Sequence, residues 1–282
     1  MSAWPAGVGV IGAGAMGRAL AAGLVRARPA LADGLRFADA LPHAAAGAAA
    51  EVGGRAAEPA EAGAADLVCL AVKPKDVEAA LGAVRPAMSG QAVLLSVVMG
   101  ASLDRLAAAA PGVPIVRTMP NLAVRSGSGV VAVAARGLGR EREAEVVDLL
   151  GGLGTVVPLS EALFGAATAV VGSGPGFVAL VAEGLEEGAV AVGLSRADAR
   201  AMVRAVLAGT ASLLDDDGDP AALRQRVTSP AGSTAEGLAR LERGAVRAHL
   251  ADAVRAAAAR AADEPGGSAT PGPSPSGETA TT

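Results

Sequence analysis

Short apolar runs alternate with amphipathic stretches through the first half of the chain. Continuous runs of Val, Ile and Leu predict strands buried on both faces of a parallel sheet, and apolar residues at helical spacing predict helices. The predicted strands cover residues 8–11, 35–38, 67–72, 93–98, 115–119, 130–135 and 155–158. The predicted helices begin after residue 17 and then cover residues 42–52, 74–84, 102–109 and 141–153. This alternation predicts a doubly wound α/β domain over residues 5–158.

Strand patterns end at residue 158, and helical patterns follow. The predicted helices cover residues 160–171, 177–192, 195–214, 221–227, 234–242 and 245–262. Ser195 and Asp198 have the spacing of a capping box at a helix start. Several helices are apolar on more than one face, so we expect a partner subunit to cover the helical domain, residues 159–262. Residues 263–282, rich in Pro, Gly, Ser and Thr, predict a disordered tail.

The composition excludes several classes of function. A chain of 282 residues can form two domains, but with no Tyr, three Phe and one Trp its core must consist of small aliphatic side chains. A net charge of −4 provides no basic surface for nucleic acid or anionic lipid. We therefore expect neither a nucleic-acid nor a membrane partner.

Cysteine and targeting patterns point to a simple soluble protein. The single cysteine, Cys69, lies within an apolar run, which predicts an inert buried thiol. No Cys/His cluster of the metal-binding kind is present, so we expect no metal site. The first residues lack the pattern of a signal peptide, and no apolar run reaches membrane-spanning length. These patterns predict a cytoplasmic protein.

A glycine motif follows the first predicted strand. Residues 8–17 read V-G-V-I-G-A-G-A-M-G, a strand and a G-x-G-x-x-G turn that leads into a helix. In this pattern Gly12 allows the tight turn, Gly14 lets the backbone approach a pyrophosphate, and Gly17 lets the helix pack closely on the strand. The alternative is an ordinary tight turn between a strand and a helix. Its position between strand and helix favours a dinucleotide-binding loop.

Asp39 follows the second predicted strand. An acid at that place accepts hydrogen bonds from the adenosine ribose hydroxyls and disfavours a 2′-phosphate. No arginine follows Asp39 closely, and His43 is the first basic residue after it. The pattern favours NADH over NADPH, and both cofactors stay candidates. The alternative is that Asp39 only caps the helix that begins near Pro42.

Lysine occurs at two positions only, Lys73 and Lys75, among 24 basic residues. Both follow the predicted strand at 67–72, and the carboxyl end of a central strand is where such sheets bind ligands. Lys73 is therefore a candidate functional residue. The alternative, a solvated helix start, is nearly as good for Lys75.

Two segments of the helical domain have unusual composition. Residues 172–176 read G-S-G-P-G, a turn whose glycines let the backbone approach another group, or a plain helix connector. Residues 227–234 read V-T-S-P-A-G-S-T and lead into a helix. Hydroxyl groups and free N–H groups at a helix start suit a carboxylate. The alternative is an N-cap on a surface helix.

These segments carry a family resemblance. Over residues 7–262 the chain resembles the pyrroline-5-carboxylate reductases, the last enzymes of proline biosynthesis. The shared motifs are the glycine loop, A-V-K-P at 71–74, M-P-N at 119–121, G-S-G-P at 172–175 and V-T-S-P-A-G-S-T-A-E-G-L at 227–238. The resemblance implies an N-terminal Rossmann domain and a C-terminal helical domain that forms homodimers or larger homo-oligomers. It also implies hydride transfer from NADH or NADPH to the C=N carbon of a small cyclic imine.

The resemblance also assigns residues to roles. It places the cofactor against Gly12, Gly14, Ala15, Met16, Gly17, Ala71, Val72, Lys73, Pro74 and Asn121. Asp39 joins these candidates through its place after the second strand, where many relatives instead have a short polar or basic run. It places the substrate against Asp217, Ser229, Gly232, Ser233 and Thr234. The Thr234 hydroxyl is implied to lie near the ring nitrogen as the catalytic group.

Several positions depart from the family pattern. The family usually has S-P-G-G-T-T where this chain has S-P-A-G-S-T at 229–234, and M-P-N-T-P where it has M-P-N-L-A. Gly176 and Phe177 replace the usual Ala-Tyr. Two alternatives to the family's reaction stay open. One is the reduction of a related cyclic imine, and the other is a non-catalytic nucleotide-binding scaffold. A β-hydroxyacid dehydrogenase is disfavoured because residues 177–192 contain no lysine.

Overall fold

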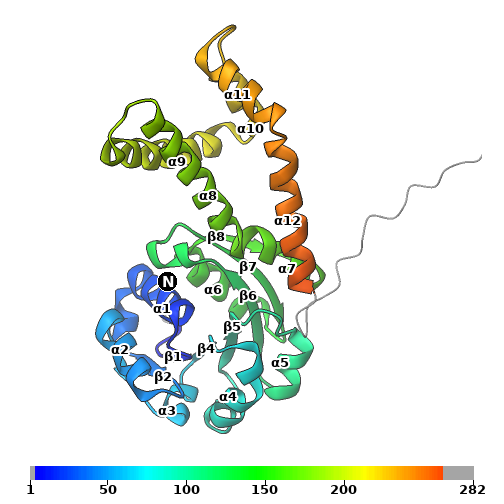
Figure 1. The fold of residues 1–282 in the computed structure, drawn as a ribbon. Coiled ribbons are helices and arrows are strands. Elements are labelled where there is room, and N and C mark those ends of the chain that lie inside the picture. The colour runs from blue at the N-terminus through cyan, green and yellow to red at the C-terminus, as the bar shows by residue number, and fades with distance from the viewer. Residues whose placement is uncertain (1–3, 263–282) are drawn as a thin grey trace, which may run out of the picture. The chain divides into compact units, whose positions relative to one another are not determined.

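The computed structural model describes residues 4–262. The contacts divide the chain into two compact units. Of the described residues, 4–172 and 257–262 form the first unit, and Ser173–Ala256 form the second. The predicted tail, residues 263–282, lies outside the described residues. Figure 1 shows the sheet with its helices and, separately labelled, the helices that follow it along the chain.

Within the described residues an eight-stranded sheet forms the centre of the first unit, with the strand order β3-β2-β1-β4-β5-β6-β7-β8. The strands are β1 Val8–Ile11, β2 Leu35–Ala38, β3 Arg55–Ala56, β4 Leu67–Leu70, β5 Val93–Ser96, β6 Ile115–Pro120, β7 Gly129–Arg136 and β8 Gly154–Pro158. All neighbouring pairs are parallel except β6 and β7. Only the short 3₁₀ helix η4, Leu122–Ser126, joins those two, and a parallel crossover needs a longer connection.

Helices cover both faces of the sheet, as a doubly wound fold requires. The helices that pack on one face are α1 Ala15–Ala27, α2 Pro42–Val52 and α6 Arg140–Gly151. The helices that pack on the other are α3 Pro59–Gly63, α4 Val77–Val84 and α5 Leu103–Ala109. Both cores consist mainly of Ala, Val and Leu, as the composition predicts.

Cys69 lies in β4, fully buried, and burial raises the pKa of its thiol to about 12. The predicted inert buried thiol is confirmed, because a protonated thiol is a poor nucleophile.

Strand β4 is shorter than the predicted strand at 67–72. The Ala71 amide still donates to the Ile11 carbonyl, and the chain then leaves the sheet. The two-residue strand β3 and the short helix α3 were not predicted, because neither is long enough to show a periodic pattern.

The second unit is helical. Its helices are α8 Gly174–Ala191, α9 Arg196–Asp217, α10 Pro220–Arg226, α11 Ser233–Arg243 and the larger part of α12 Val246–Ala262. Ser195 caps α9 by accepting from the Asp198 amide. In a full capping box the Asp198 side chain would accept from the Ser195 backbone amide. Here the Asp198 carboxylate accepts from the Ser195 hydroxyl instead. An ion pair between Glu186 and Arg200 links α8 to α9 at 3.6 Å.

The segment at residues 172–176 is not the interrupting turn that was predicted. A short helix α7, Phe164–Ala167, continues into a π-helical turn, Thr168–Gly172, and α8 begins two residues later. Pro175 is tolerated because it lies in the first turn of α8, where its missing N–H would have no intrahelical partner. The glycines therefore belong mostly to a helix start, and the turn is reduced to Ser173.

The prediction that no apolar run reaches membrane-spanning length is wrong for one stretch. The helical segment Glu161–Ala191 has 31 residues, with a window of mean hydropathy 1.6 that is 28% buried. By length and composition alone it could cross a membrane. Large apolar side chains on α8 and α9 are exposed in the single chain, namely Val178, Leu180, Val181, Leu185, Met202, Val206 and Leu213. Such a surface agrees with the expectation that another subunit covers these helices.

Candidate active site

The glycine loop turns where the motif requires it. Gly12 has a φ of +99°, a conformation that favours glycine, and a Cβ added there would lie 2.5 Å from the Ala71 carbonyl oxygen. A Cβ on Gly17 would lie 2.1 Å from the Gly12 carbonyl oxygen. Both positions therefore need glycine, the first to make the turn and the second to let α1 pack against it.

Gly14 has a different role in the same loop. It is exposed, and an added Cβ would meet nothing within 4 Å. Gly14 is also the N-cap of α1, and no side chain caps the helix there. The first N–H groups of a helix have no intrahelical partner and favour an anion, so this end of α1 suits a pyrophosphate.

A cavity of about 570 Å³ opens beside the loop. Six of the predicted cofactor residues line it: Gly12, Gly14, Asp39, Ala71, Val72 and Lys73. Five others do not line it. Ala15 and Met16 lie in the first turn of α1, Gly17 lies beneath the loop, Pro74 begins the 3₁₀ helix η2 Pro74–Asp76, and Asn121 follows β6. The structure thus brings together residues from the carboxyl ends of β1, β2 and β4.

Asp39 contacts the glycine loop directly. Its Oδ2 accepts a hydrogen bond from the Ala13 amide at 2.7 Å, and its Oδ1 accepts one from the Leu41 amide at 2.9 Å. The N-cap residue of α2 is Leu41, which has no side-chain cap. Asp39 therefore does not cap α2, and instead ties the end of β2 to the loop.

Arg105 forms a hydrogen bond to the segment that contains Lys73 and Lys75. Arg105 forms two hydrogen bonds to Glu78, at 2.7 and 2.9 Å, and donates to the Pro74 carbonyl at 2.7 Å. These hydrogen bonds hold the pKa of the Glu78 carboxyl below its usual range. Lys73 and Lys75 remain exposed at the cavity. Sequence reasoning missed Arg105, since one arginine in a chain so rich in them carries no signal.

Asn121 has a structural contact that the motif did not reveal. Its side-chain oxygen accepts from the Ala123 amide at 3.2 Å and from the Val130 amide at 3.4 Å. Asn121 therefore caps η4 and ties it to the start of β7. Its role at the cofactor stays a prediction.

The predicted substrate segment forms the N-terminus of α11. Gly232 is the N-cap, without a side-chain cap, and its amide donates to the Ser229 carbonyl at 3.1 Å. Ser233 and Thr234 open the helix and are exposed. Of the four hydroxyls in the segment, Thr228 is already engaged, donating to the Arg224 carbonyl at 2.6 Å. Within the described part of the chain, the hydroxyls of Ser229, Ser233 and Thr234 form no such hydrogen bond, an arrangement that suits the predicted carboxylate.

Ala231 and Asp217 also belong to the region predicted to bind the substrate. Ala231 has a φ of +57°, in the left-handed region. This is the position where the resembled family has glycine, so the departure noted in the sequence falls on a strained residue. Asp217, the predicted acidic contact, is the last residue of α9, and its side chain lies outside the described part of the structure.

Comparison with known proteins identifies the family. A curated pyrroline-5-carboxylate reductase from Mycobacterium leprae is 35% identical over 279 residues, covering 90% of this chain and 95% of the relative. One from a Synechocystis strain is 37% identical over 199 residues, covering 68% and 72%. This chain belongs to the pyrroline-5-carboxylate reductase family.

Family profiles and solved structures agree. A profile described as pyrroline-5-carboxylate reductase dimerisation matches residues 161–264, and one described as NADP oxidoreductase, coenzyme F420-dependent, matches residues 7–100. A pyrroline carboxylate reductase of Plasmodium falciparum, solved with NADP bound, has a TM-score of 0.80 at 25% identity, covering 92% of this chain and 98% of that one. The Streptococcus pyogenes enzyme has a TM-score of 0.78 at 27% identity, covering 90% and 97%.

The dimerisation match bears on the exposed apolar helices. The stretch Glu161–Ala191, which is apolar enough to span a membrane, lies inside the matched region. The match supports homo-oligomerisation through the C-terminal helices, which gives their exposed apolar side chains a partner.

Proposed function

We propose that this protein reduces the C=N bond of 1-pyrroline-5-carboxylate to L-proline with NADH or NADPH. The observation that carries the proposal is membership of the family over nearly its full length, including the 227–238 motif. We assign cofactor binding to residues 5–158 and substrate binding with dimerisation to residues 159–262. A cytoplasmic location follows from this soluble biosynthetic role.

Binding of the cofactor requires groups that hold its pyrophosphate and its ribose hydroxyls. The amides at the start of α1, next to Gly14, receive the pyrophosphate, and the Asp39 carboxylate receives the ribose hydroxyls. When bound, the reduced nicotinamide supplies the hydride. Ala71, Val72 and Lys73, which follow β4, line the cavity that would hold the dinucleotide.

The substrate side needs orientation more than acid–base chemistry. A protonated cyclic imine is already electrophilic, so the protein mainly positions it and excludes water. The first amides of α11 and the hydroxyls of Ser229 and Ser233 hold the carboxylate. Thr234 places its hydroxyl at the ring nitrogen. Asp217 and Gly232 complete this proposed site.

A steady-state assay tests the proposal. Purified protein is mixed with 1-pyrroline-5-carboxylate and either NADH or NADPH, and loss of the reduced cofactor and formation of proline are followed. We expect turnover with at least one cofactor. No turnover by folded protein that binds the cofactor would overturn the proposal and favour a scaffold. Turnover restricted to other cyclic imines would favour the related-imine alternative, which the Ala231 and Ser233 departures motivate.

Variants of Thr234 test its assigned role. Thr234→Val, which replaces the hydroxyl with a methyl group, should lower kcat by about tenfold or more, the worth of one hydrogen bond to a charged group. Thr234→Ser keeps the hydroxyl and should retain most of the activity. The Kd for the cofactor should be unchanged in both. Equal losses in kcat and in cofactor affinity would argue against placing Thr234 at the substrate.

A further inference from the structure

A second cavity adjoins the cofactor cavity at the end of β2. It has a volume of about 440 Å³ and shares Asp39, Ala40 and Pro59 with the first. Glu58 and Glu61 form its far wall, from the segment that contains α3. The acidic residue that would face the adenosine ribose therefore has two more carboxylates beyond it.

The Asp39 carboxylate is held in one position. The two hydrogen bonds from Ala13 and Leu41, one to each oxygen, come from the glycine loop and from the start of α2. A carboxylate has about four acceptor sites, so two remain for the two ribose hydroxyls. Turning the carboxylate away to admit a phosphate would break both backbone bonds and leave the Ala13 amide, in a buried residue, without its acceptor.

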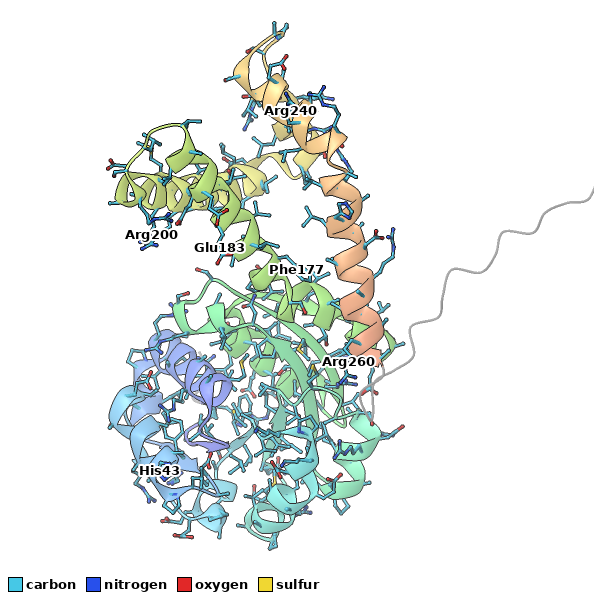
Figure 2. All side chains as sticks on the ribbon, viewed as in Figure 1. His43, Phe177, Glu183, Arg200, Arg240 and Arg260 are labelled. Atoms are coloured by element: carbon cyan, nitrogen blue, oxygen red, sulfur yellow. The ribbon has the colours of Figure 1, made fainter. Side chains whose placement is uncertain are left out.

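Two arginines near this edge, Arg18 and Arg55, already have acidic partners, and the exposed Lys73 and Lys75 line only the first cavity, not the one beside Glu58 and Glu61. Arg55 forms two hydrogen bonds to Glu61, at 2.9 and 3.2 Å, and these bonds lower the pKa of the Glu61 carboxyl. Arg18 pairs with Glu51 at 3.2 Å and donates to the Ala13 carbonyl. Among the described residues, no arginine lines either cavity. His43 lies in the first turn of α2 and lines neither (Figure 2).

We propose that this enzyme selects NADH and rejects NADPH, with Asp39 as the specificity-determining residue and Glu58 as a second carboxylate in the adjoining cavity. This inference rests on the proposed function, since it assumes that the cavity holds a nicotinamide dinucleotide. Like charges a few ångströms apart repel, and the repulsion grows where water is partly excluded. A doubly charged phosphate beside a fixed carboxylate is therefore strongly disfavoured.

Binding measured without substrate tests the inference. Isothermal titration calorimetry of the full chain with NADH and with NADPH gives the two Kd values independently of turnover. We expect NADH to bind about tenfold more tightly or better, because the repulsion weakens NADPH binding alone. Asp39→Asn keeps an acceptor for a backbone amide and removes the charge, so it should reduce the NADH/NADPH ratio to near one.

A second variant leaves Asp39 and its hydrogen bonds in place. Ala40 is exposed and lines both cavities, so Ala40→Arg adds a guanidinium where a 2′-phosphate would lie and should tighten NADPH binding. Ala46→Arg is the matched control, since it adds the same charge on an exposed position of α2 outside both cavities and should leave both Kd values unchanged.

The outcomes separate this inference from the proposed function. NADPH binding as tight as NADH in the unaltered protein, or an unchanged ratio in both Asp39→Asn and Ala40→Arg, would overturn the inference alone. Binding of neither dinucleotide would overturn the proposed function together with it. A strong NADH preference without any imine reduction would support the inference and contradict the proposed function.

Discussion

Ala231 adopts a backbone conformation that ordinarily favours glycine, with a φ of +57°. A left-handed conformation costs a residue with a Cβ roughly 1–2 kcal/mol, because the Cβ crowds the following carbonyl oxygen. The strain lies two residues before α11, in the proposed substrate segment, where strained backbone is often found. The sequence shows that alanine replaces the family's glycine here, but only the backbone angle shows that this replacement stores strain.

Replacing Ala231 by glycine should stabilise the protein. Relief of the left-handed strain outweighs the greater entropy of glycine in the unfolded chain, for an expected gain of about 1 kcal/mol or less. The control is Ala239→Gly, at an exposed position inside α11, which should destabilise by about 1 kcal/mol. The shift of the urea midpoint measures both. A loss for Ala231→Gly as large as that of the control would contradict the strain.

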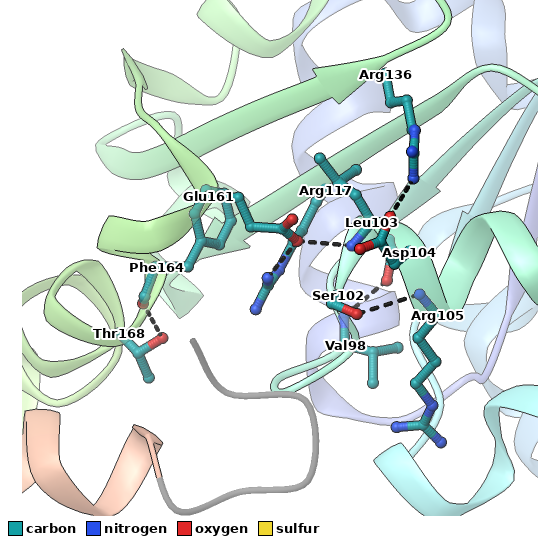
Figure 3. Close-up of polar contacts among 11 residues, drawn as sticks. Val98, Ser102, Leu103, Asp104, Arg105, Arg117, Arg136, Glu161, Phe164 and Thr168 are labelled. Atoms are coloured by element: carbon teal, nitrogen blue, oxygen red, sulfur yellow. Dashed lines mark hydrogen bonds and ion pairs between the residues drawn. The ribbon is translucent and has the colours of Figure 1, made fainter. Parts of the chain in front are cut away.

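At the scale of elements, a buried arginine joins three segments of the first unit (Figure 3). Arg117 in β6 is 3% exposed, pairs with Glu161 at 2.6 Å, and lies over the Phe164 ring at 4.5 Å from its centroid. Glu161 also accepts from the Leu103 amide at the start of α5, at 2.6 Å. These contacts fix the segment before the π-helical turn to the sheet and to α5. A buried charge needs such partners, because desolvation disfavours it otherwise.

Removing Arg117 should break its ion pair with Glu161 and its contact with the Phe164 ring. We expect Arg117→Met to destabilise the protein by about 3 kcal/mol, the usual loss when one member of a buried pair is deleted. Adding Glu161→Gln removes the remaining charge and retains an acceptor for the Leu103 amide, so the double variant should recover part of the loss. Thermal unfolding of the three proteins measures the coupling. If the losses simply add, the two side chains are independent and the pair is not an anchor.

Particular residues show what the sequence could predict. The glycine loop was predicted correctly because the positive φ of Gly12 and the close contact of Gly17 with the Gly12 carbonyl both lie within the motif itself. The direction of β7 was not predicted, since it depends on the connection over residues 121–128, whose conformation is set partly by Asn121. Asp39 accepts from Ala13, which is 26 positions earlier in the chain, and Arg117 pairs with Glu161, which is 44 positions later. No periodic pattern in the sequence reveals contacts over such separations.

At the scale of the whole molecule, the two units have different chemical character. The first buries an aliphatic core on each face of a sheet and carries the cavity proposed for the dinucleotide. The second is built from helices with exposed apolar side chains and carries the hydroxyl-lined start of α11. The match of residues 161–264 to a dimerisation profile explains why a single chain leaves those side chains uncovered.

Transfer of deuterium from cofactor to product tests the central claim, reduction of a cyclic imine by hydride transfer. The enzyme is given 1-pyrroline-5-carboxylate and NADH with deuterium at both positions of the nicotinamide C4, and the proline formed is analysed by mass spectrometry. We predict one deuterium in each proline, on the carbon that was doubly bonded to nitrogen. Proline without the label, or no proline from protein that binds the cofactor, would contradict the account.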